Sequence, residues 1–407
     1  MAPIQTEIAP RFRKTAETFA AAAKTLPQRY FISSEILAKE RAEIFLKEWL
    51  LVGHESRIAE PGDYIVQTIN EESLIVIRDK NRKIHGLFNV CRHRGSRLIE
   101  DNGGNCAAIQ CPYHAWTYAL DGRLLGGPHM DDVPRFNKTD YSLHPVNLGI
   151  WEGFVFVNLR DASTHRGGYS VQEWFAPLAG KFSRWNLPVL RSAKRIEYDV
   201  RANWKLIFEN YSECYHCAGV HPELSKISPS DSAENDLTEG PFLGGFMKIN
   251  AGKSLTMSGN ECALGIADSS RAGDRAPAHD RNLSQEIEND HEHEDDGKSR
   301  VFYYSIFPNM LLSLHPDYVM VHQLQPLAPD RTLILCDWFF HPDAFGREDF
   351  NPHDAIEFWD MVNKQDWHVC ELSQQGIASR AYQPGPYSAR ESVPAAWDEY
   401  YLQRMKT

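Results

Sequence analysis

Two short segments of this sequence each place one cysteine and one histidine close together: CRHRG at residues 91–95 and CPYHAW at residues 111–116. The spacing is C-x-H in the first segment and C-x-x-H in the second. Thiolate and imidazole ligands on paired loops suit zinc or an iron–sulfur cluster. Zinc fingers usually pair cysteine with cysteine, whereas each segment here supplies one residue of each type. A [2Fe–2S] cluster with two cysteines on one iron and two histidines on the other fits this pattern. The candidate ligands are Cys91, His93, Cys111 and His114.

Alternating apolar runs surround both segments from about Leu46 to Leu159: DYIVQTI, SLIVIRD, HGLFNV and GFVFVNL. Glycine, asparagine and aspartate separate these runs, as is typical of short strands joined by turns. We therefore predict an all-β unit that carries each Cys-His pair on a turn. Cys106 lies between the pairs but outside the pattern, and we expect it to be a bystander. We expect three aromatic side chains to pack around the metal and shield it: Tyr113, Trp116 and Tyr118.

The segments CRHRGSRL and CPYHAWTY resemble the signature of Rieske proteins, which hold a [2Fe–2S] cluster of this kind. Rieske proteins of respiratory chains carry an extra cysteine in each loop, and the two are joined as a disulfide. This sequence has Ser96 and Tyr113 at those places. The resemblance is therefore to the oxygenase or ferredoxin type, which has the lower reduction potential.

The size and composition of the chain limit its class. A chain of 407 residues is too long for one ordinary core, so we expect two domains or one large domain with an insertion. The net charge of −12 argues against nucleic acid as the main partner. No apolar run approaches the length of a membrane helix, and the N-terminus lacks the apolar core of a signal peptide. We expect a cytoplasmic protein with no membrane partner, whose eight cysteines are thiols or metal ligands rather than disulfides.

A second cluster of potential ligands lies in ANWKLIFENYSECYHCAGVHPEL. Its apolar and aromatic positions recur at helical spacing, which predicts one helix from residue 203 to about 219, with Pro222 helping to end it. His216 and His221 stand five residues apart, across the expected helix end. Two histidines and one carboxylate would form a facial triad for non-haem Fe(II), with open positions for O2.

This segment resembles the mononuclear-iron motif in the large (α) subunits of Rieske non-haem iron oxygenases. The resemblance implies that His216 and His221 are iron ligands and that the third ligand is an aspartate on a C-terminal helix. The pattern NKQDWHVCE places that ligand at Asp366, with Asp360 and Asp354 as rivals on the same helix.

The residues beside His216 have separate expected roles. We expect Cys214 and Cys217 to be packed thiols rather than ligands. The resemblance implies that Glu213 bridges two metal centres, because an imidazole ligated through one nitrogen presents its other N–H to a carboxylate. The bridge would run from His114 of one chain through Glu213 to His216 of the next chain, which implies a homotrimer. The family usually has aspartate at this place, and glutamate occurs in the branch that acts on quaternary ammonium substrates.

The resemblance extends from about residue 30 to 400 and is greatest to the group of glycine betaine monooxygenase and stachydrine (proline betaine) demethylase. The supporting stretches are NVCRHRGSRL, NWKLIFENYSECYHC, VHPEL and AYQPGPYS. The implied function is that of a terminal oxygenase, which uses O2 to hydroxylate an N-methyl group of a small quaternary ammonium substrate. The products would be the demethylated amine and formaldehyde. A quaternary cation has no N–H to donate, so we expect aromatic faces to bind it and a basic side chain to bind its carboxylate.

Two other functions stay open. The same metal centres could hydroxylate or dihydroxylate an aromatic ring, and a diol product would then replace formaldehyde. The chain could also be an electron-transfer Rieske protein with an inactive second domain, although the set His216, His221 and Asp366 argues against this. The sequence has no glycine-rich dinucleotide motif and no flavin motif. We therefore expect electrons from NAD(P)H to arrive through a separate flavin or iron–sulfur reductase.

The expected fold is α+β, with the all-β Rieske domain inserted into a helix-grip-like catalytic domain. We expect residues 1–46 to be the N-terminal helical part of the catalytic domain, with the Ala-rich stretch before Pro27 as an amphipathic helix. Residues 47–160 would form the Rieske domain and residues 161–407 the rest of the catalytic domain. Its antiparallel sheet would contain RVFYYSIF, NMLLSLH, YVMVHQLQPL and RTLILCDWFFH.

We predict a long helix over residues 353–380. One of its faces should point inward, and it carries Trp359, Asn363, Asp366 and Cys370. Residues 264–299 are polar and predict a loop.

Overall fold

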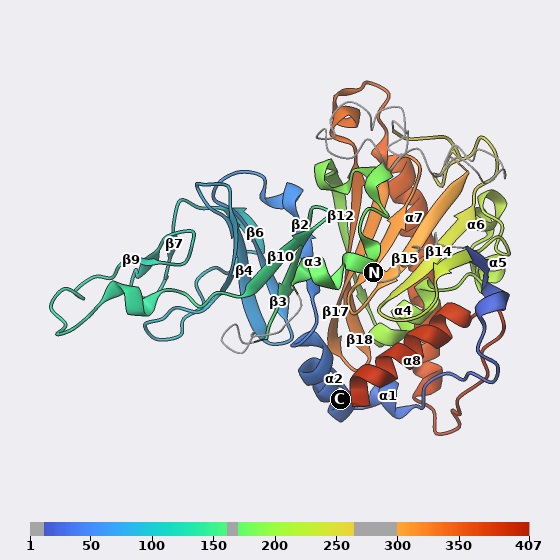
Figure 1. The fold of residues 1–407 in the computed structure, drawn as a ribbon, viewed down its shortest axis with the longest axis horizontal. Helices are drawn as coiled ribbons and strands as arrows, with labels where there is room; N and C mark the ends of the chain where they lie inside the picture. The colour runs from blue at the N-terminus through green and yellow to red at the C-terminus, as the bar shows by residue number, and fades with distance from the viewer. Residues whose placement is uncertain (1–11, 161–169, 264–298, 407) are drawn as a thin grey trace, which may run out of the picture.

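The computed structural model describes residues 12–160, 170–263 and 299–406, and it contains two lobes joined side by side (Figure 1). The smaller lobe is built from short antiparallel strands and lies at the left of Figure 1. The larger lobe contains one long antiparallel sheet packed against helices. This arrangement confirms the α+β class with a β-rich Rieske-like part and a large antiparallel sheet. The domain boundaries at residues 47 and 160 stay a prediction. Among the described residues, no helix combines the length and apolarity that crossing a bilayer requires.

The smaller lobe contains three sheets whose strands pair with antiparallel neighbours. The sheet orders are β5-β4-β3-β6, β7-β8-β9 and β10-β11-β2. The strands are β2 (Leu50–His54), β3 (Asp63–Ile69), β4 (Glu72–Arg78), β5 (Ile84–Phe88), β6 (Gly103–Asn105), β7 (Ile109–Gln110), β8 (Thr117–Tyr118), β9 (Leu124–Gly126), β10 (Asn147–Trp151) and β11 (Phe154–Asn158). The four alternating runs of the sequence therefore form the strands that they predict.

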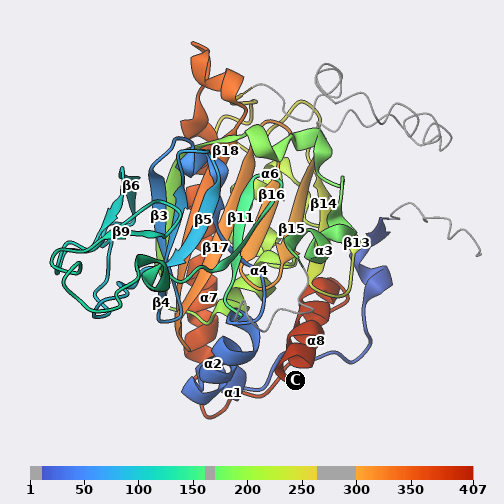
Figure 2. The ribbon, with the colours of Figure 1, turned by 60° about the vertical axis from the view of Figure 1, so that its left-hand side comes forward.

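The large sheet of the second lobe has the order β1-β13-β14-β15-β16-β17-β18-β12. Its strands are β1 (Arg13–Lys14), β12 (Arg191–Val200), β13 (Glu234–Leu237), β14 (Phe242–Lys248), β15 (Arg300–Ile306), β16 (Met310–Leu314), β17 (Val319–Ala328) and β18 (Arg331–Phe340). The α-helices of the chain are α1 (Arg29–Ile32), α2 (Ser34–Glu40), α3 (Val171–Trp174), α4 (Trp204–Tyr211), α5 (Cys217–Val220), α6 (Pro222–Ile227), α7 (Pro352–Ile377) and α8 (Ser392–Lys406). Figure 2 shows α4, α7 and α8 gathered on one side of this sheet.

The two faces of the large sheet differ because successive side chains of a strand point to opposite sides. Tyr304 and Ile306 of β15 pack with Phe156 of β11 and Phe175 in an apolar cluster that joins the two lobes. Ser305 points the other way, toward α4, where it shares a hydrogen bond with a serine hydroxyl. One face therefore packs against the smaller lobe, and the other is free to line a site beneath the helices.

Two helix predictions are wrong. The single helix expected over residues 203–219 ends at Tyr211, because side chains after it bond the backbone locally and compete with helical bonds. Pro222, expected to end that helix, instead occupies the first position of α6, where its missing N–H is not needed. The Ala-rich stretch before Pro27 is not an α-helix in its described part: Thr15–Thr18 form one 3-10 turn, and the chain then bonds the segment before α8.

The long helix is confirmed as α7 (Pro352–Ile377), and Trp359, Asn363 and Cys370 are buried on its inner face. The sequence interpretation did not identify α8 (Ser392–Lys406), which packs on α4 through Trp397 and Phe208. The polar loop predicted at 264–299 lies outside the described residues except at its last position.

A pair of carboxyl groups at the junction of α4 and α8 makes stability depend on pH. Burial raises the pKa of Asp398 to about 7, and burial beside Asp398 raises the pKa of Glu209 well above its usual range. The pair therefore holds more protons in the folded state than in the unfolded state between about pH 4 and 7. The stability that this pair contributes is greatest below the unfolded pKa and is lost as pH rises through the folded pKa.

We expect Asp398→Asn to weaken this dependence, because the amide keeps the bond from the Tyr387 hydroxyl without gaining charge. The measurement is the free energy of unfolding at pH 5 and pH 8. Between pH 5 and pH 8 the wild type should lose about 2–4 kcal/mol more of its free energy of unfolding than the variant does. Equal pH dependence in both proteins would show that Asp398 is ionised in the folded state near pH 5.

Candidate functional site

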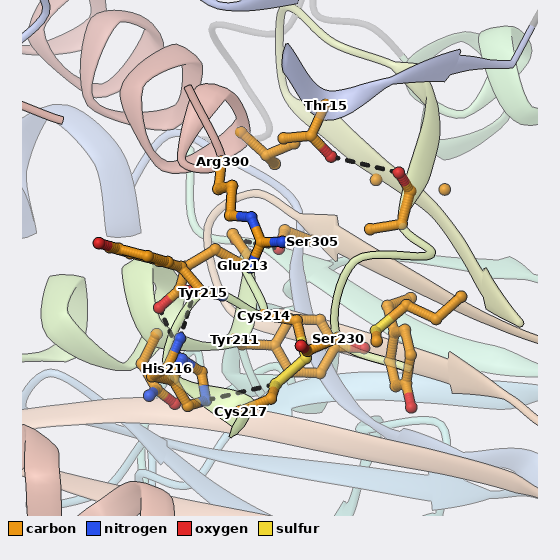
Figure 3. A pocket seen from close by; sticks show the side chains of 18 of the residues that line it. Thr15, Tyr211, Glu213, Cys214, Tyr215, His216, Cys217, Ser230, Ser305 and Arg390 are labelled. Carbon is orange, nitrogen blue, oxygen red and sulfur yellow. Dashed lines mark hydrogen bonds and ion pairs between the residues drawn. A yellow bond between two sulfur atoms is a disulfide. The ribbon is translucent and has the colours of Figure 1, made fainter. Parts of the chain in front are cut away.

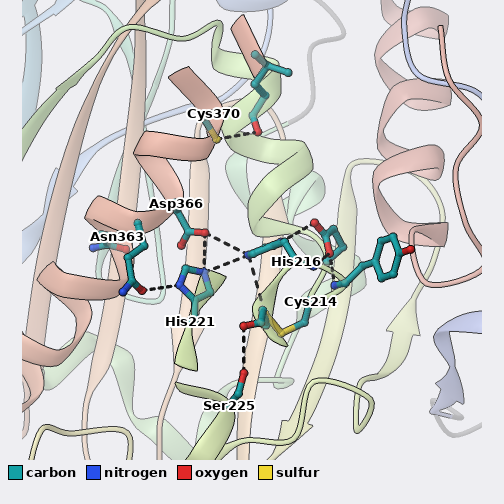
Figure 4. Close-up of polar contacts among 12 residues, drawn as sticks. Cys214, His216, His221, Ser225, Asn363, Asp366 and Cys370 are labelled. Carbon is teal, nitrogen blue, oxygen red and sulfur yellow. Dashed lines mark hydrogen bonds and ion pairs between the residues drawn. A yellow bond between two sulfur atoms is a disulfide. The ribbon is translucent and has the colours of Figure 1, made fainter. Parts of the chain in front are cut away.

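Two histidines five residues apart and a distant aspartate converge beneath the large sheet (Figure 4). His216 Nε2 lies 3.2 Å from His221 Nε2 and 3.2 Å from Asp366 Oδ1. The distance from His221 Nε2 to Asp366 Oδ1 is 2.9 Å. Their ligand atoms thus surround one point, and His221 is buried while the other two are partly buried. The structure brings together all three residues that the sequence proposed as iron ligands.

The local chain path explains this convergence. Asn203 caps α4, since its side chain accepts a hydrogen bond from the backbone N–H of Lys205 at 3.0 Å. After α4 ends, Glu213 accepts hydrogen bonds from the backbone N–H groups of Tyr215 and His216, and so fixes the turn that carries the first histidine. His221 then separates α5 from α6, and α7 brings its aspartate from the other side.

The outer nitrogen of each histidine has its own acceptor. His216 Nδ1 lies 2.6 Å from Glu213 Oε1, and His221 Nδ1 lies 2.7 Å from Gln365 Oε1. An acceptor at Nδ1 favours the tautomer that leaves Nε2 unprotonated, which is the arrangement of metal-binding histidines. Two imidazole lone pairs and a carboxylate then face the same point, so the residues present fit a metal ion. The sequence interpretation missed Gln365, whose place beside Asp366 on α7 gave no distinguishing signal.

The charges at this point also favour a cation. Burial alone lowers the pKa of His216, but hydrogen bonds and charge from Asp366 and Glu213 outweigh it and raise the pKa to about 10. Burial opposes ionisation of Asp366, yet the two histidines hold its pKa below the usual range. Two carboxylates thus stabilise positive charge between them, which a divalent ion such as Fe²⁺ would supply.

The rival aspartates on α7 do not reach this point. Asp360 accepts a hydrogen bond of 2.9 Å from the Tyr198 hydroxyl and pairs with Lys364 on the helix surface. Asp354 accepts a hydrogen bond of 3.0 Å from the backbone N–H of Ser258. Both carboxylates are therefore used to hold other segments in place.

The expectation that Cys214 and Cys217 are thiols is wrong, because the structure joins them in a disulfide. The turn between α4 and α5 brings their Cα atoms to 5.0 Å, within the range that a disulfide spans. Cys217 Sγ lies 3.9 Å from His216 Nε2. The other six cysteines carry no disulfide, and Cys106 is a partly buried thiol.

The two Cys-His segments of the smaller lobe form matched loops. In the first, the backbone N–H of Gly95 donates to Cys91 O, and the N–H of Cys91 donates to Ser96 O. In the second, the N–H of Ala115 donates to Cys111 O in the same way, and the N–H of Cys111 donates to Trp116 O. Gly95 and Ala115 both adopt positive φ, of 75° and 56°. The two loops therefore present their ligands alike from opposite sides.

The loops also fit a cluster chemically. Both cysteines are buried, and the rings of His93 and His114 lie 4.8 Å apart. His114 Nδ1 is buried and has no hydrogen-bond partner among the described residues, which is expected of a nitrogen that binds metal. Tyr118 places its hydroxyl 3.3 Å from Cys91 Sγ.

The aromatic residues beside the second loop behave in two ways. Trp116 is buried and stacks on His93 at 4.8 Å, and Tyr118 is also buried, so both pack as expected. Tyr113 stacks on His114 at 3.8 Å but keeps 56% of its surface exposed. Tyr113 therefore lies between His114, which is partly buried, and the solvent.

A cavity of about 240 Å³ opens beside the converged triad (Figure 3). Its lining includes His216, His221, Asp366 and Glu213. Six aromatic residues also line it: Tyr211, Tyr215, Phe246, Tyr303, Trp359 and Trp367. Figures 1 and 2 both place the strands around the matched loops, β7 to β9, at one end of the molecule and α4 and α7 in the other lobe.

Comparison with known proteins identifies the family. A family model described as "Ring hydroxylating alpha subunit (catalytic domain)" matches residues 188–407, more than half of the chain. A second, described as "Rieske [2Fe-2S] domain", matches residues 48–137. The chain belongs to the Rieske ring-hydroxylating oxygenases, as an alpha subunit. The family assigns a Rieske cluster to the smaller lobe and a catalytic non-haem iron to the larger one, so the zinc and electron-transfer alternatives are set aside.

Relatives of this Rieske oxygenase differ in substrate. The glycine betaine monooxygenase oxygenase subunit of Chromohalobacter salexigens is 32% identical over 380 residues, 89% of this chain and 82% of that protein. A solved quaternary ammonium Rieske monooxygenase has a TM-score of 0.76 and 25% identity, covering 98% of this chain and 100% of its own. Naphthalene 1,2-dioxygenase from Rhodococcus shares the fold alone, with a TM-score of 0.73, 22% identity and 94% of each chain covered. The fold by itself therefore does not distinguish the substrates.

Proposed function

We propose that this Rieske oxygenase subunit demethylates a small betaine-type quaternary ammonium compound. The observation that carries the proposal is a cavity that joins a 2-His-1-carboxylate triad to aromatic walls. One oxygen atom of O2 enters a C–H bond of an N-methyl group, and the other leaves as water with two electrons and two protons. The C–N bond of the hydroxymethyl product then breaks, which releases the tertiary amine, formaldehyde and a proton.

The aromatic walls suit a quaternary cation. The rings of Tyr211 and Tyr303 lie 6.0 Å apart, and those of Tyr303 and Trp359 lie 6.3 Å apart, each pair set edge to face. These rings form adjoining walls whose faces can contact methyl groups that carry positive charge. The carboxylates of Glu213 and Asp366 add negative potential at the same end. A cation without N–H groups needs such walls rather than hydrogen-bond acceptors.

The geometry supports the following ligand assignments, which are part of the proposal. We assign His216, His221 and Asp366 to the mononuclear iron, and Cys91, His93, Cys111 and His114 to the [2Fe–2S] cluster. When bound, the iron supplies O2 activation and the cluster supplies electrons. The protein holds the histidine tautomers through Glu213 and Gln365, keeps the substrate against aromatic walls and limits access of water to the triad.

The bridge between centres is proposed to cross subunits. Within one chain the matched loops and the triad lie in different lobes, as Figure 1 shows. Glu213 lines the cavity and bonds His216, while His114 is partly buried beneath the exposed ring of Tyr113. A homotrimer in which His114 of one subunit meets Glu213 of its neighbour would join them. A separate flavin or iron–sulfur reductase would deliver the electrons from NAD(P)H.

The proposal is tested with a panel of substrates, a surrogate reductase and NADH. We expect O2 uptake and formaldehyde release with at least one trimethylammonium or dimethylammonium acid, in about equal amounts. NADH alone, without a reductase, should give neither. The second candidate is hydroxylation of an aromatic ring, which the shared fold with naphthalene dioxygenase and the aromatic walls also allow. A diol product from an arene, with no formaldehyde from any betaine, would favour that candidate.

A further inference from the structure

The lining of the cavity beside the triad contains more acidic than basic side chains. Three acids line it, Glu213, Asp231 and Asp366, and the triad end is negative before any metal binds. Among the described lining residues, the only lysine or arginine side chains are Lys14 and Arg390. A substrate that contains both a quaternary nitrogen and a carboxylate therefore has two candidate partners for its negative end.

Arg390 has the better position of the two. It stands on the turn directly before α8, and Figure 3 shows its side chain extending into the cavity. Its backbone N–H donates to Ser388 Oγ, but its guanidinium makes no hydrogen bond or ion pair with the described residues. Lys14 lies on the edge strand β1, opposite Glu234 of β13, and it is exposed, as Arg390 also is. Arginine also presents a fork of N–H donors that matches a carboxylate, which a lysine ammonium does not.

The turn that carries Arg390 is held firmly, although the Arg390 side chain has no polar partner in the part of the chain that the structure describes. The backbone N–H of Ser388 donates to Glu391 Oε2 at 2.7 Å, and the N–H of Glu391 donates to Ser388 O at 3.0 Å. The Tyr387 hydroxyl donates to Asp398 Oδ2 at 2.8 Å and so ties the turn to α8. The neighbouring acid, Glu391, is thus used within the turn. A fixed backbone with a free guanidinium is suited to bind an incoming anion.

Other polar groups of the lining are already partnered. The hydroxyls of Ser212 and Ser305 lie 2.8 Å apart, and the Tyr211 hydroxyl lies 2.9 Å from Ser313 Oγ. Asn235 donates to the Thr15 hydroxyl at 3.1 Å. These groups have less capacity for a carboxylate than a guanidinium that has no partner among the described residues.

We propose that Arg390 binds the substrate's carboxylate and makes the site selective for zwitterionic betaines over quaternary cations that lack an acid. The inference rests on the proposed function, because it assigns the two ends of the substrate within the same cavity. The ammonium group would lie among the aromatic walls near the triad, and the carboxylate would meet Arg390.

The test compares glycine betaine with choline, which carries a hydroxyl in place of the carboxylate. We expect Arg390→Gln to lower kcat/KM for glycine betaine about 10- to 100-fold, mainly through KM, since a charged hydrogen bond is lost. The kcat/KM of the variant for choline should stay within about 2-fold of the wild-type value. Arg380→Gln, an exposed arginine at the end of α7, is the matched control and should change neither. Lys14→Gln tests the rival cation.

Calorimetric binding to the metal-loaded protein separates the two proposals. If no compound yields formaldehyde, the proposed function fails. The role of Arg390 as the carboxylate partner is still supported if the wild type binds glycine betaine and the Arg390→Gln substitution raises the Kd of glycine betaine about 10- to 100-fold without changing the Kd of choline. The inference would be overturned if Arg390→Gln changed the Kd of both compounds equally or changed neither. It would also be overturned if Lys14→Gln, rather than Arg390→Gln, weakened the binding of glycine betaine alone, or if the wild type did not bind glycine betaine.

Discussion

Replacing Asp366 by alanine is expected to remove the mononuclear iron and to abolish turnover while leaving the cluster intact. Its Oδ1 lies near both imidazole Nε2 atoms, at 3.2 Å from His216 and 2.9 Å from His221. Without it, two neutral nitrogens remain, and the site loses the negative charge that a divalent ion requires. Turnover should fall more than ~100-fold, because even loss of an outer-shell partner can cost that much.

The measurement is iron content per chain together with the visible spectrum of the cluster. Iron should fall from about three to about two atoms, since a [2Fe–2S] cluster retains two, and the spectrum should not change. Asp360→Ala is the matched control on the same helix, because its carboxylate bonds Tyr198 and Lys364 instead. Full iron and activity in Asp366→Ala, or loss of iron in Asp360→Ala, would show that the ligand is assigned wrongly.

Glu213→Gln should leave both metal centres loaded but slow electron transfer between them by more than ~100-fold. The amide oxygen can still accept the hydrogen bond that His216 Nδ1 donates to Glu213 across 2.6 Å, so the ligand keeps its tautomer. The variant loses the negative charge, the second oxygen that accepts from the backbone N–H groups of Tyr215 and His216, and the capacity to accept from a second imidazole on a neighbouring subunit. A carboxylate that bridges two ligated histidines cannot be replaced by a neutral amide without weakening one contact.

Stopped-flow reoxidation of the reduced cluster in the presence of substrate and O2 measures this step. Glu223→Gln, an exposed acid on α6 that pairs with Lys226, is a matched control and should behave as the wild type. If reoxidation in Glu213→Gln keeps the wild-type rate, the residue does not bridge the centres. Loss of iron from the variant would instead indicate a purely structural role for the carboxylate.

The sequence predicted the parts of the molecule that depend on local pattern. The alternation of apolar residues identified the strands, and helical spacing identified α7 together with its inner face. The four cluster residues were found because thiolate and imidazole groups at such spacing have few other uses, whereas the resemblance to Rieske oxygenases implied the three triad residues. The structure brings each set together, and their binding of metal remains the proposal that the variants test.

What the sequence did not predict depends on contacts between distant segments. The predicted helix was extended past Tyr211 to about residue 219, but Glu213, Ser212 and the Cys214–Cys217 bond draw this part of the backbone out of the helix. Gln365 holds His221 only because α6 and α7 meet in space. Arg390 enters the cavity through the docking of α8, a helix whose weak amphipathic pattern gave no signal.

The central claim is that O2 is used at this chain's triad to remove an N-methyl group. A single turnover tests it most directly: chemically reduced protein, without a reductase, is mixed with O2 and glycine betaine labelled with ¹³C in its methyl groups. The account predicts labelled formaldehyde in the wild type and none in the Asp366→Ala variant. Reoxidation of the cluster with no labelled formaldehyde from glycine betaine or any other N-methylated betaine would contradict it.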